Sequence, residues 1–159
     1  MKKLLNSICK LQNLQTLLLD RYEKLEELPK DIRYMISLRW LSITTKQKSL
    51  PTTWNSLRNL VLFNFGNLES LSEMLQGCTC LLQMLIIDSC GGMISLIPIP
   101  KFLTSLEVLA IENCEKIDLT EGEDNQEEFP TSLRALSFYE LPQLVVLPEW
   151  IKCESSISV

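Results

Sequence analysis

The spacing of leucine is the feature that most constrains what this chain can fold into. Residues 133–148 follow the template L-x-x-L-x-L-x-x-φ-x-x-L-x-x-L-P, where φ is a small or apolar residue and Phe138 replaces one leucine. Leu136 and Phe138 lie two positions apart, as in a β-strand, whereas the flanking leucines recur every three positions, which suits a turn or a short 3₁₀ helix. A segment that alternates briefly and then turns back cannot bury its apolar side alone. It therefore needs a similar segment on each side.

The template recurs along the chain. Its first leucine is found six times, as Leu14, Leu38, Leu57, Leu82, Leu106 and Leu133. The steps between these positions are 24, 19, 25, 24 and 27 residues. Steps in the low to mid twenties are the period of leucine-rich repeats. The sequence thus predicts an α/β leucine-rich-repeat solenoid of about six repeats, with a curved parallel sheet on its concave face and irregular, 3₁₀ or short-helical returns on its convex face.

Two repeats depart from the template. The second is two residues short between Ile43 and Leu50, which predicts a tighter turn. The fifth runs into residues 115–128, where seven acidic residues stand against one lysine. We expect this insertion to protrude as a solvated loop, or alternatively to contact a basic surface.

The repeats make residues 1–159 a single domain. The chain begins shortly before its first repeat and ends soon after a repeat closes, without an evident polar capping unit. Solenoids need such units at both ends. We therefore expect a piece of a longer array, or a truncated gene product.

Composition narrows the function classes. A formal charge of -5 disfavours nucleic acid as a partner. No apolar run approaches the length of about 18 residues that a membrane span needs, and polar residues soon interrupt the apolar N-terminus, so we expect neither a membrane partner nor a cleaved signal. The chain has no histidine, which removes the usual general base and the Ser-His-Asp triad. The sequence predicts a cytoplasmic protein that is not an enzyme.

The six cysteines lack the spacing of a zinc cluster. Cys90 and Cys114 occupy equivalent positions after the strands of adjacent repeats, a position that Tyr22, Phe65 and Leu141 take elsewhere. A buried structural ladder is the main interpretation, with a disulfide or a metal site as alternatives.

Several segments resemble a known family. These are residues 25–32 (LEELPKDI), 38–41 (LRWL) and 147–151 (LPEWI), together with the cysteines after two strands. They resemble the repeat domain of plant nucleotide-binding leucine-rich-repeat disease-resistance proteins of the coiled-coil class, over residues 8 to 151. The resemblance implies recognition and autoinhibition. The family's ADP or ATP site lies in an upstream module whose phosphate-loop motif this chain lacks, so no cofactor is expected.

Alternate strand residues are expected to point outward in three rows across the sheet. We expect Thr44 to point outward in the third row. The candidate protein-binding residues are Leu18, Asp20, Trp40, Val61, Phe63, Met84, Ile86, Asp88, Glu112 and Tyr139. Trp40 and Phe63 are the predicted anchors of an apolar centre with an acidic border. The alternative is that an open sheet simply tolerates scattered apolar residues.

The sequence therefore predicts a protein-binding module. By resemblance its partner is a pathogen effector, a host protein that such receptors monitor, or the nucleotide-binding domain of a fuller receptor. A truncated, non-signalling fragment or decoy is one alternative, and a stand-alone leucine-rich-repeat adaptor is another.

Overall fold

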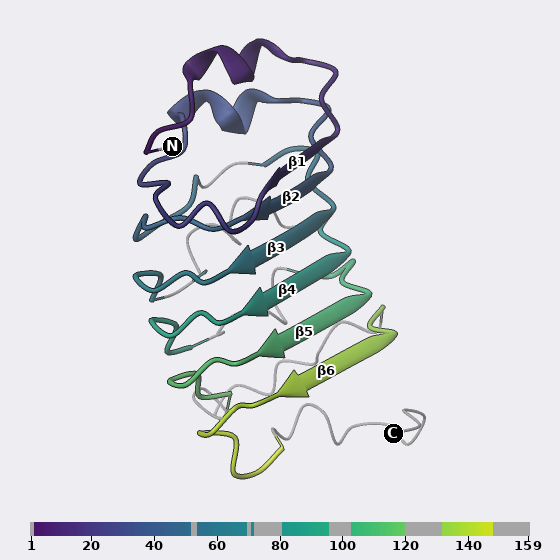
Figure 1. Cartoon of the computed structure of the whole chain (residues 1–159). Coiled ribbons are helices and arrows are strands. Elements are labelled where there is room, and N and C mark those ends of the chain that lie inside the picture. Colours follow the sequence, from purple (N-terminus) through teal and green to yellow (C-terminus); the bar gives the residue numbers. More distant parts are fainter. Residues whose placement is uncertain are drawn as a thin grey trace.

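A single parallel sheet runs the length of the molecule (Figure 1). The computed structural model describes residues 2–51, 54–69, 71, 81–95, 103–119 and 132–147. The sheet has six strands in chain order: β1 (Thr16–Leu19), β2 (Trp40–Ile43), β3 (Asn59–Phe63), β4 (Met84–Asp88), β5 (Val108–Glu112) and β6 (Ala135–Tyr139). Each strand pairs in parallel with the next, so every repeat contributes one coil to a stack. The predicted solenoid with a parallel sheet is confirmed.

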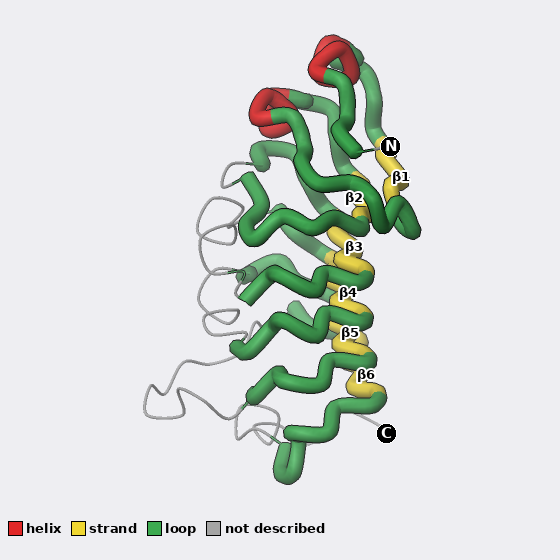
Figure 2. The backbone as a smooth tube through the Cα atoms, turned by 60° about the vertical axis from the view of Figure 1, so that its left-hand side comes forward, coloured by secondary structure: helices red, strands yellow, loops and turns green. Residues whose placement is uncertain are grey.

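The returns between strands are mostly irregular (Figure 2). Within the described ranges the helical elements are two 3₁₀ helices, η1 (Asn6–Lys10) and η2 (Lys30–Tyr34), and no α-helix occurs there. Pro29 precedes η2 and fixes the backbone at the entry to that turn. None of the helices formed by the described residues is long and apolar enough to cross a membrane.

The template leucines line the inner face of the sheet. The register places two rows of inward side chains side by side, because strand neighbours match position for position. The first row is Leu17, Leu41, Leu60, Leu85, Leu109 and Leu136, and the second is Leu19, Ile43, Leu62, Ile87, Ile111 and Phe138. From β2 to β5 these side chains are almost completely removed from water. Burial of each contributes about 1.5–3 kcal/mol, but only because a coil on either side covers it.

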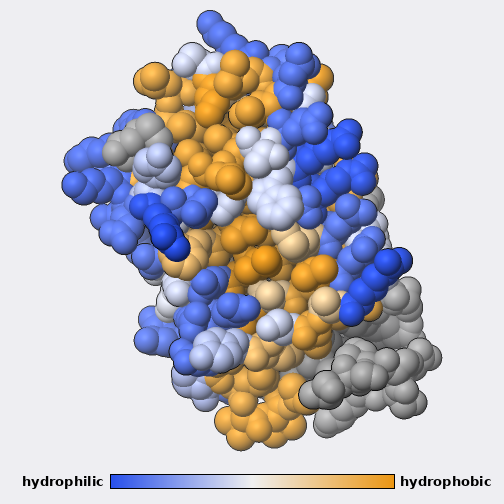
Figure 3. Space-filling model, turned by 45° about the vertical axis from the view of Figure 1, so that its right-hand side comes forward, coloured by the Kyte–Doolittle hydropathy of each residue, from blue (hydrophilic) through white to orange (hydrophobic). Residues whose placement is uncertain are grey.

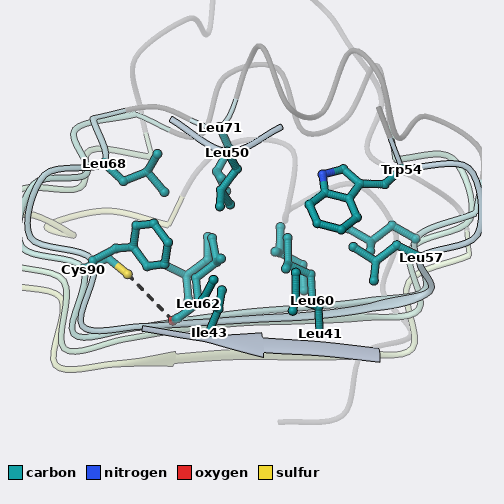
Figure 4. Packing of buried hydrophobic residues seen from close by; sticks show 14 of the residues in the cluster. Leu41, Ile43, Leu50, Trp54, Leu57, Leu60, Leu62, Leu68, Leu71 and Cys90 are labelled. Carbon is teal, nitrogen blue, oxygen red and sulfur yellow. Dashed lines mark hydrogen bonds between the residues drawn. The ribbon is translucent and has the colours of Figure 1, made fainter. Parts of the chain in front are cut away.

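Side chains from the returns close the core from the other side (Figure 4). Leu50, Leu68 and Leu71 face the leucines that rise from the sheet. Trp54 fills the second coil, where the indole Nε1 donates to the Pro51 carbonyl oxygen at 2.6 Å. The core is thus a flat layer between sheet and returns, continuous along the stack.

A left-handed residue turns the chain away from the sheet after five of the six strands. These residues have φ between 48° and 65° and are Arg21, Asn64, Ser89, Asn113 and Glu140. In three coils the backbone N–H at this position donates to a main-chain oxygen of the next coil, for example from Asn64 to the Asp88 carbonyl oxygen at 2.9 Å. The residue that follows then points inward, and in the middle coils it is the fully buried Phe65, Cys90 or Cys114.

The second coil has no such left-handed residue among those described, and this corrects one prediction. Thr44 was expected to point outward, but it is 2% exposed. Its Oγ1 accepts a hydrogen bond from the Arg21 backbone N–H at 3.0 Å, while the Thr45 hydroxyl donates to the Leu25 carbonyl oxygen at 2.9 Å. Because this repeat is two residues short, the chain must turn inward immediately after Ile43. The predicted tighter turn is therefore present, and the two threonine hydroxyls form hydrogen bonds with main-chain groups there.

The buried position after the strand is also less uniform than predicted. Tyr22 was assigned to it but is 47% exposed, so the prediction is wrong there. Leu141, in the last coil, is only partly buried. Both lie in terminal coils, where a neighbour is lacking on one side of the strand within the described residues.

The acidic segment begins inside the fifth coil rather than outside it. Ile117 and Leu119 belong to the core, and Asp118 pairs with Ser95 in a parallel bridge. The prediction of a protruding loop therefore fails for residues 115–119, and its remainder, residues 120–128, lies outside the described ranges. Cys78, Cys80 and Cys153 also lie outside them.

Candidate binding surface

The solvent-facing side of the sheet, called the sheet face below, carries the predicted rows. The strand register confirms them. The first row is Thr16, Trp40, Asn59, Met84, Val108 and Ala135; the second is Leu18, Ser42, Val61, Ile86, Ala110 and Ser137; the third is Phe63, Asp88, Glu112 and Tyr139. Asp20 lies exposed one residue beyond the end of β1, and so flanks the third row rather than belonging to a strand.

An apolar band crosses the sheet face along the stack, with hydrophilic residues on both sides (Figure 3). Leu18 is 57% exposed and Trp40 is 38% exposed. Val61, Phe63, Met84 and Ile86 are half-buried. Ser42 and Ala110 are small and buried between neighbours, so the band is shallow at those two points.

The two predicted anchors do not lie side by side. Trp40 pairs with Asn59 at the start of β3, whereas Phe63 is at the end of that strand. Four residues of a strand span about 13 Å. Val61 lies between them on β3, and Ile86 lies beside Val61 on β4. Tyr139 lies three strands from Phe63, about 14 Å across the sheet, and is a separate exposed ring.

Carboxylates border the band at the ends of β4 and β5. Asp88 and Glu112 are register neighbours. One Asp88 oxygen, Oδ1, accepts from the Ser89 hydroxyl at 2.9 Å and from Asn113 Nδ2 at 2.8 Å. These bonds hold the Asp88 carboxylate in place at the turn.

Tyr139 extends this border. A hydrogen bond with Glu140, together with the negative charge of that carboxylate, raises the pKa of the Tyr139 phenol. The phenol of Tyr139 therefore stays protonated at neutral pH.

The opposite border contains residues that the sequence reasoning missed. Arg39 and Arg58 immediately precede β2 and β3, and both are exposed. The Arg39 carbonyl oxygen accepts from the backbone N–H groups of Arg58 and Asn59, each at 2.9 Å. A sequence signal existed, because each arginine directly follows the first leucine of its repeat. Strand alternation identifies only the positions inside the strands.

The described residues offer no other chemical site. Among them no three His, Cys, Asp or Glu side chains are grouped to hold a metal ion. Their buried side-chain nitrogen and oxygen atoms all have hydrogen-bond partners. Cys9, Cys90 and Cys114 are buried free thiols. A scan against protein-family models found no match, and neither did searches of curated proteins and of solved structures.

Proposed function

We propose that this chain is a leucine-rich-repeat module that binds another protein through the sheet face. The observation that carries the proposal is the continuous apolar band, which includes Trp40 and Phe63 and is bordered by charges. Apolar and aromatic residues exposed together with a polar rim are typical of protein interaction surfaces. A sheet held by its buried leucine rows is also a rigid platform that can present such residues without a change of fold.

The resemblance of the sequence extends this proposal to the sensing part of a plant intracellular immune receptor in the cytoplasm. Its support is the repeat period, the 38–41 segment and the cysteines after the strands. The partner is then a pathogen or host protein, or the nucleotide-binding domain of a fuller receptor. In that mechanism the sheet face holds the switch closed, and a competing partner shifts the population toward the open state.

Binding is tested with a double variant, Trp40→Ala with Phe63→Ala. Proteins from a plant coding library are displayed and selected for binding to the full wild-type chain. The affinity of each selected protein is then measured for wild type and for the double variant. Loss of these two anchor side chains is expected to weaken binding at least about thirtyfold, as loss of hot-spot residues does. Val145→Ala is the matched control, because Val145 is 88% exposed and lies beyond the last strand. Clones whose affinity is the same for the double variant as for wild type would contradict the proposal.

The receptor assignment has its own test, which is the coding sequence upstream of Met1. An in-frame phosphate-loop module there supports the receptor. An independent promoter and start site with no such module would instead support a stand-alone adaptor or decoy.

A further inference from the structure

Two pairs of like charge border the middle of the sheet face at opposite corners. Arg39 and Arg58 stand at the starting ends of β2 and β3. Neither forms an ion pair with another described residue. Asp88 and Glu112 stand at the finishing ends of the next two strands, β4 and β5. The sheet face therefore presents a cationic pair and an anionic pair, not one uniform sign.

The apolar band lies between these pairs. Arg58 and Phe63 are five residues apart on one chain segment, about 16 Å along the strand, and neighbouring strands are about 4.8 Å apart. The basic pair is therefore about 17–22 Å from the acidic pair, measured diagonally across the sheet. The register neighbours Val61 and Ile86 lie on this diagonal.

We propose that the partner presents a polypeptide segment with an acidic group at one end, a basic group at the other and apolar side chains between. This inference rests on the proposed function, and it identifies the chemistry of the partner at the same surface. The acidic end lies over Arg39 and Arg58, and the basic end lies over Asp88 and Glu112. The separation corresponds to about 5–7 residues of extended chain, or to about 11–15 residues of helix.

The apolar residues and the charge pairs contribute differently to binding. Half-buried apolar side chains contribute affinity because binding removes them from water. The charge pairs, of which the arginines are exposed and the carboxylates half-buried, contribute less affinity but select the partner and fix its orientation. A nucleic acid is disfavoured, because its phosphates would meet Asp88 and Glu112 as well as the arginines.

The test is a selection of displayed random 16-residue peptides on the full chain and on two charge variants. One variant is Arg39→Glu with Arg58→Glu. The other is Asp88→Asn with Glu112→Lys, because asparagine retains the oxygen that accepts from Ser89 and Asn113. Wild type is expected to enrich peptides with an acidic and a basic end. The first variant is expected to enrich peptides that are basic at both ends, and the second peptides that are acidic at both ends.

A peptide selected on wild type is then measured by titration. We expect at least a tenfold loss on either variant, and recovery on the arginine variant when the acidic end of the peptide is changed to lysine. Lys10→Glu with Lys30→Glu is the control, since both lysines are exposed on the 3₁₀ helices. Thermal unfolding of each variant establishes that it is folded.

The outcomes separate the two proposals. Peptides that require Trp40 and Phe63 but show the same charge pattern on all three proteins would overturn this inference and leave the proposed function standing. A selection that yields no peptide dependent on Trp40 and Phe63 would overturn the proposed function, and this inference with it.

Discussion

The Cys90 thiol donates a hydrogen bond to the main-chain oxygen of Leu62 on the preceding coil, with Sγ and O 3.7 Å apart (Figure 4). Cys114 repeats the contact one coil later, with its Sγ 4.0 Å from the Ile87 carbonyl oxygen. Because Leu62 and Ile87 are register neighbours, the two contacts are successive steps of one ladder. The structural interpretation of these cysteines is thus confirmed. Each thiol links the turn of its own coil to the strand before it.

The ladder predicts a pH dependence of stability that depends on Cys90. Interaction with the Cys114 thiol, together with burial, raises the pKa of the Cys90 thiol above its ordinary 9.0, and the same interaction lowers the pKa of Cys114. The folded chain therefore keeps this proton at pH values where the unfolded chain releases it. Because the folded pair of thiols retains one proton, stability falls with rising pH only above about pH 9, where the unfolded chain loses both thiol protons, by up to about 1.4 kcal/mol per pH unit.

Cys90→Ser removes the ionisable group and retains a small donor to Leu62. We expect the free energy of unfolding to fall less steeply with pH in the variant than in wild type between about pH 9 and pH 10.5. Urea unfolding in reducing buffer measures both curves. Parallel curves would show that Cys90 ionises equally in the folded and unfolded states.

At Gly92 the main chains of two coils approach each other closely. A Cβ added there would lie 2.4 Å from the Gly66 carbonyl oxygen and 3.2 Å from that of Leu68, both main-chain atoms of the preceding coil. Gly92→Ala must therefore push the coils apart, and we expect it to lower the free energy of unfolding by about 1–3 kcal/mol. Gly91→Ala is the matched control, since a Cβ at Gly91 has nothing within 4 Å. Equal urea midpoints for the two variants would argue against this packing.

The sequence predicted the parts of the fold that the repeat period determines. Leucine spacing located all six strands, and equal positions in successive repeats gave the register that places Val61 beside Ile86. The repeat period does not predict the path of the backbone where a repeat changes length. Thr44 turns inward because its coil is two residues short, and no template position describes that turn.

Strand alternation predicts which strand residues of the candidate site point outward, and it predicts nothing more about that site. Alternation identifies Trp40 and Phe63 as outward, but their separation across Val61 depends on where each strand begins and ends. Arg39 and Arg58 were missed because they precede the strands. The contact at Gly92 depends on the backbone of another coil, and no spacing within one repeat encodes it.

Leu17 and Leu18 test the division between core and surface within two adjacent residues of β1. Leu17 is 8% exposed and points into the core, whereas Leu18 is 57% exposed on the sheet face. We expect Leu17→Ala to cost about 2–3 kcal/mol of unfolding free energy, and Leu18→Ala to cost no more than about 0.5 kcal/mol. Chemical unfolding of both variants measures the difference. Similar losses for the two would contradict the assigned register of this strand.

Glu140 is the left-handed residue of the last coil, with φ of 48°. A side chain with a Cβ is strained in this region by about 1–2 kcal/mol, whereas glycine adopts it freely but loses more entropy on folding. Glu140→Gly is therefore expected to stabilise the chain by about 0.5–1 kcal/mol. Asn64→Gly, at the equivalent position after β3, should change stability little because asparagine tolerates this conformation.

Glu140→Gly has a second, independent readout in the titration of Tyr139. The substitution removes both the hydrogen bond and the negative charge that raise the Tyr139 pKa. The pKa of this phenol should therefore fall toward its ordinary value of 10.0. The difference between the ultraviolet titrations of variant and wild type isolates it from the other two tyrosines. A fall in pKa without a gain in stability would mean that the Tyr139–Glu140 contact offsets the strain at φ of 48°, so that the last coil holds its left-handed residue by that contact.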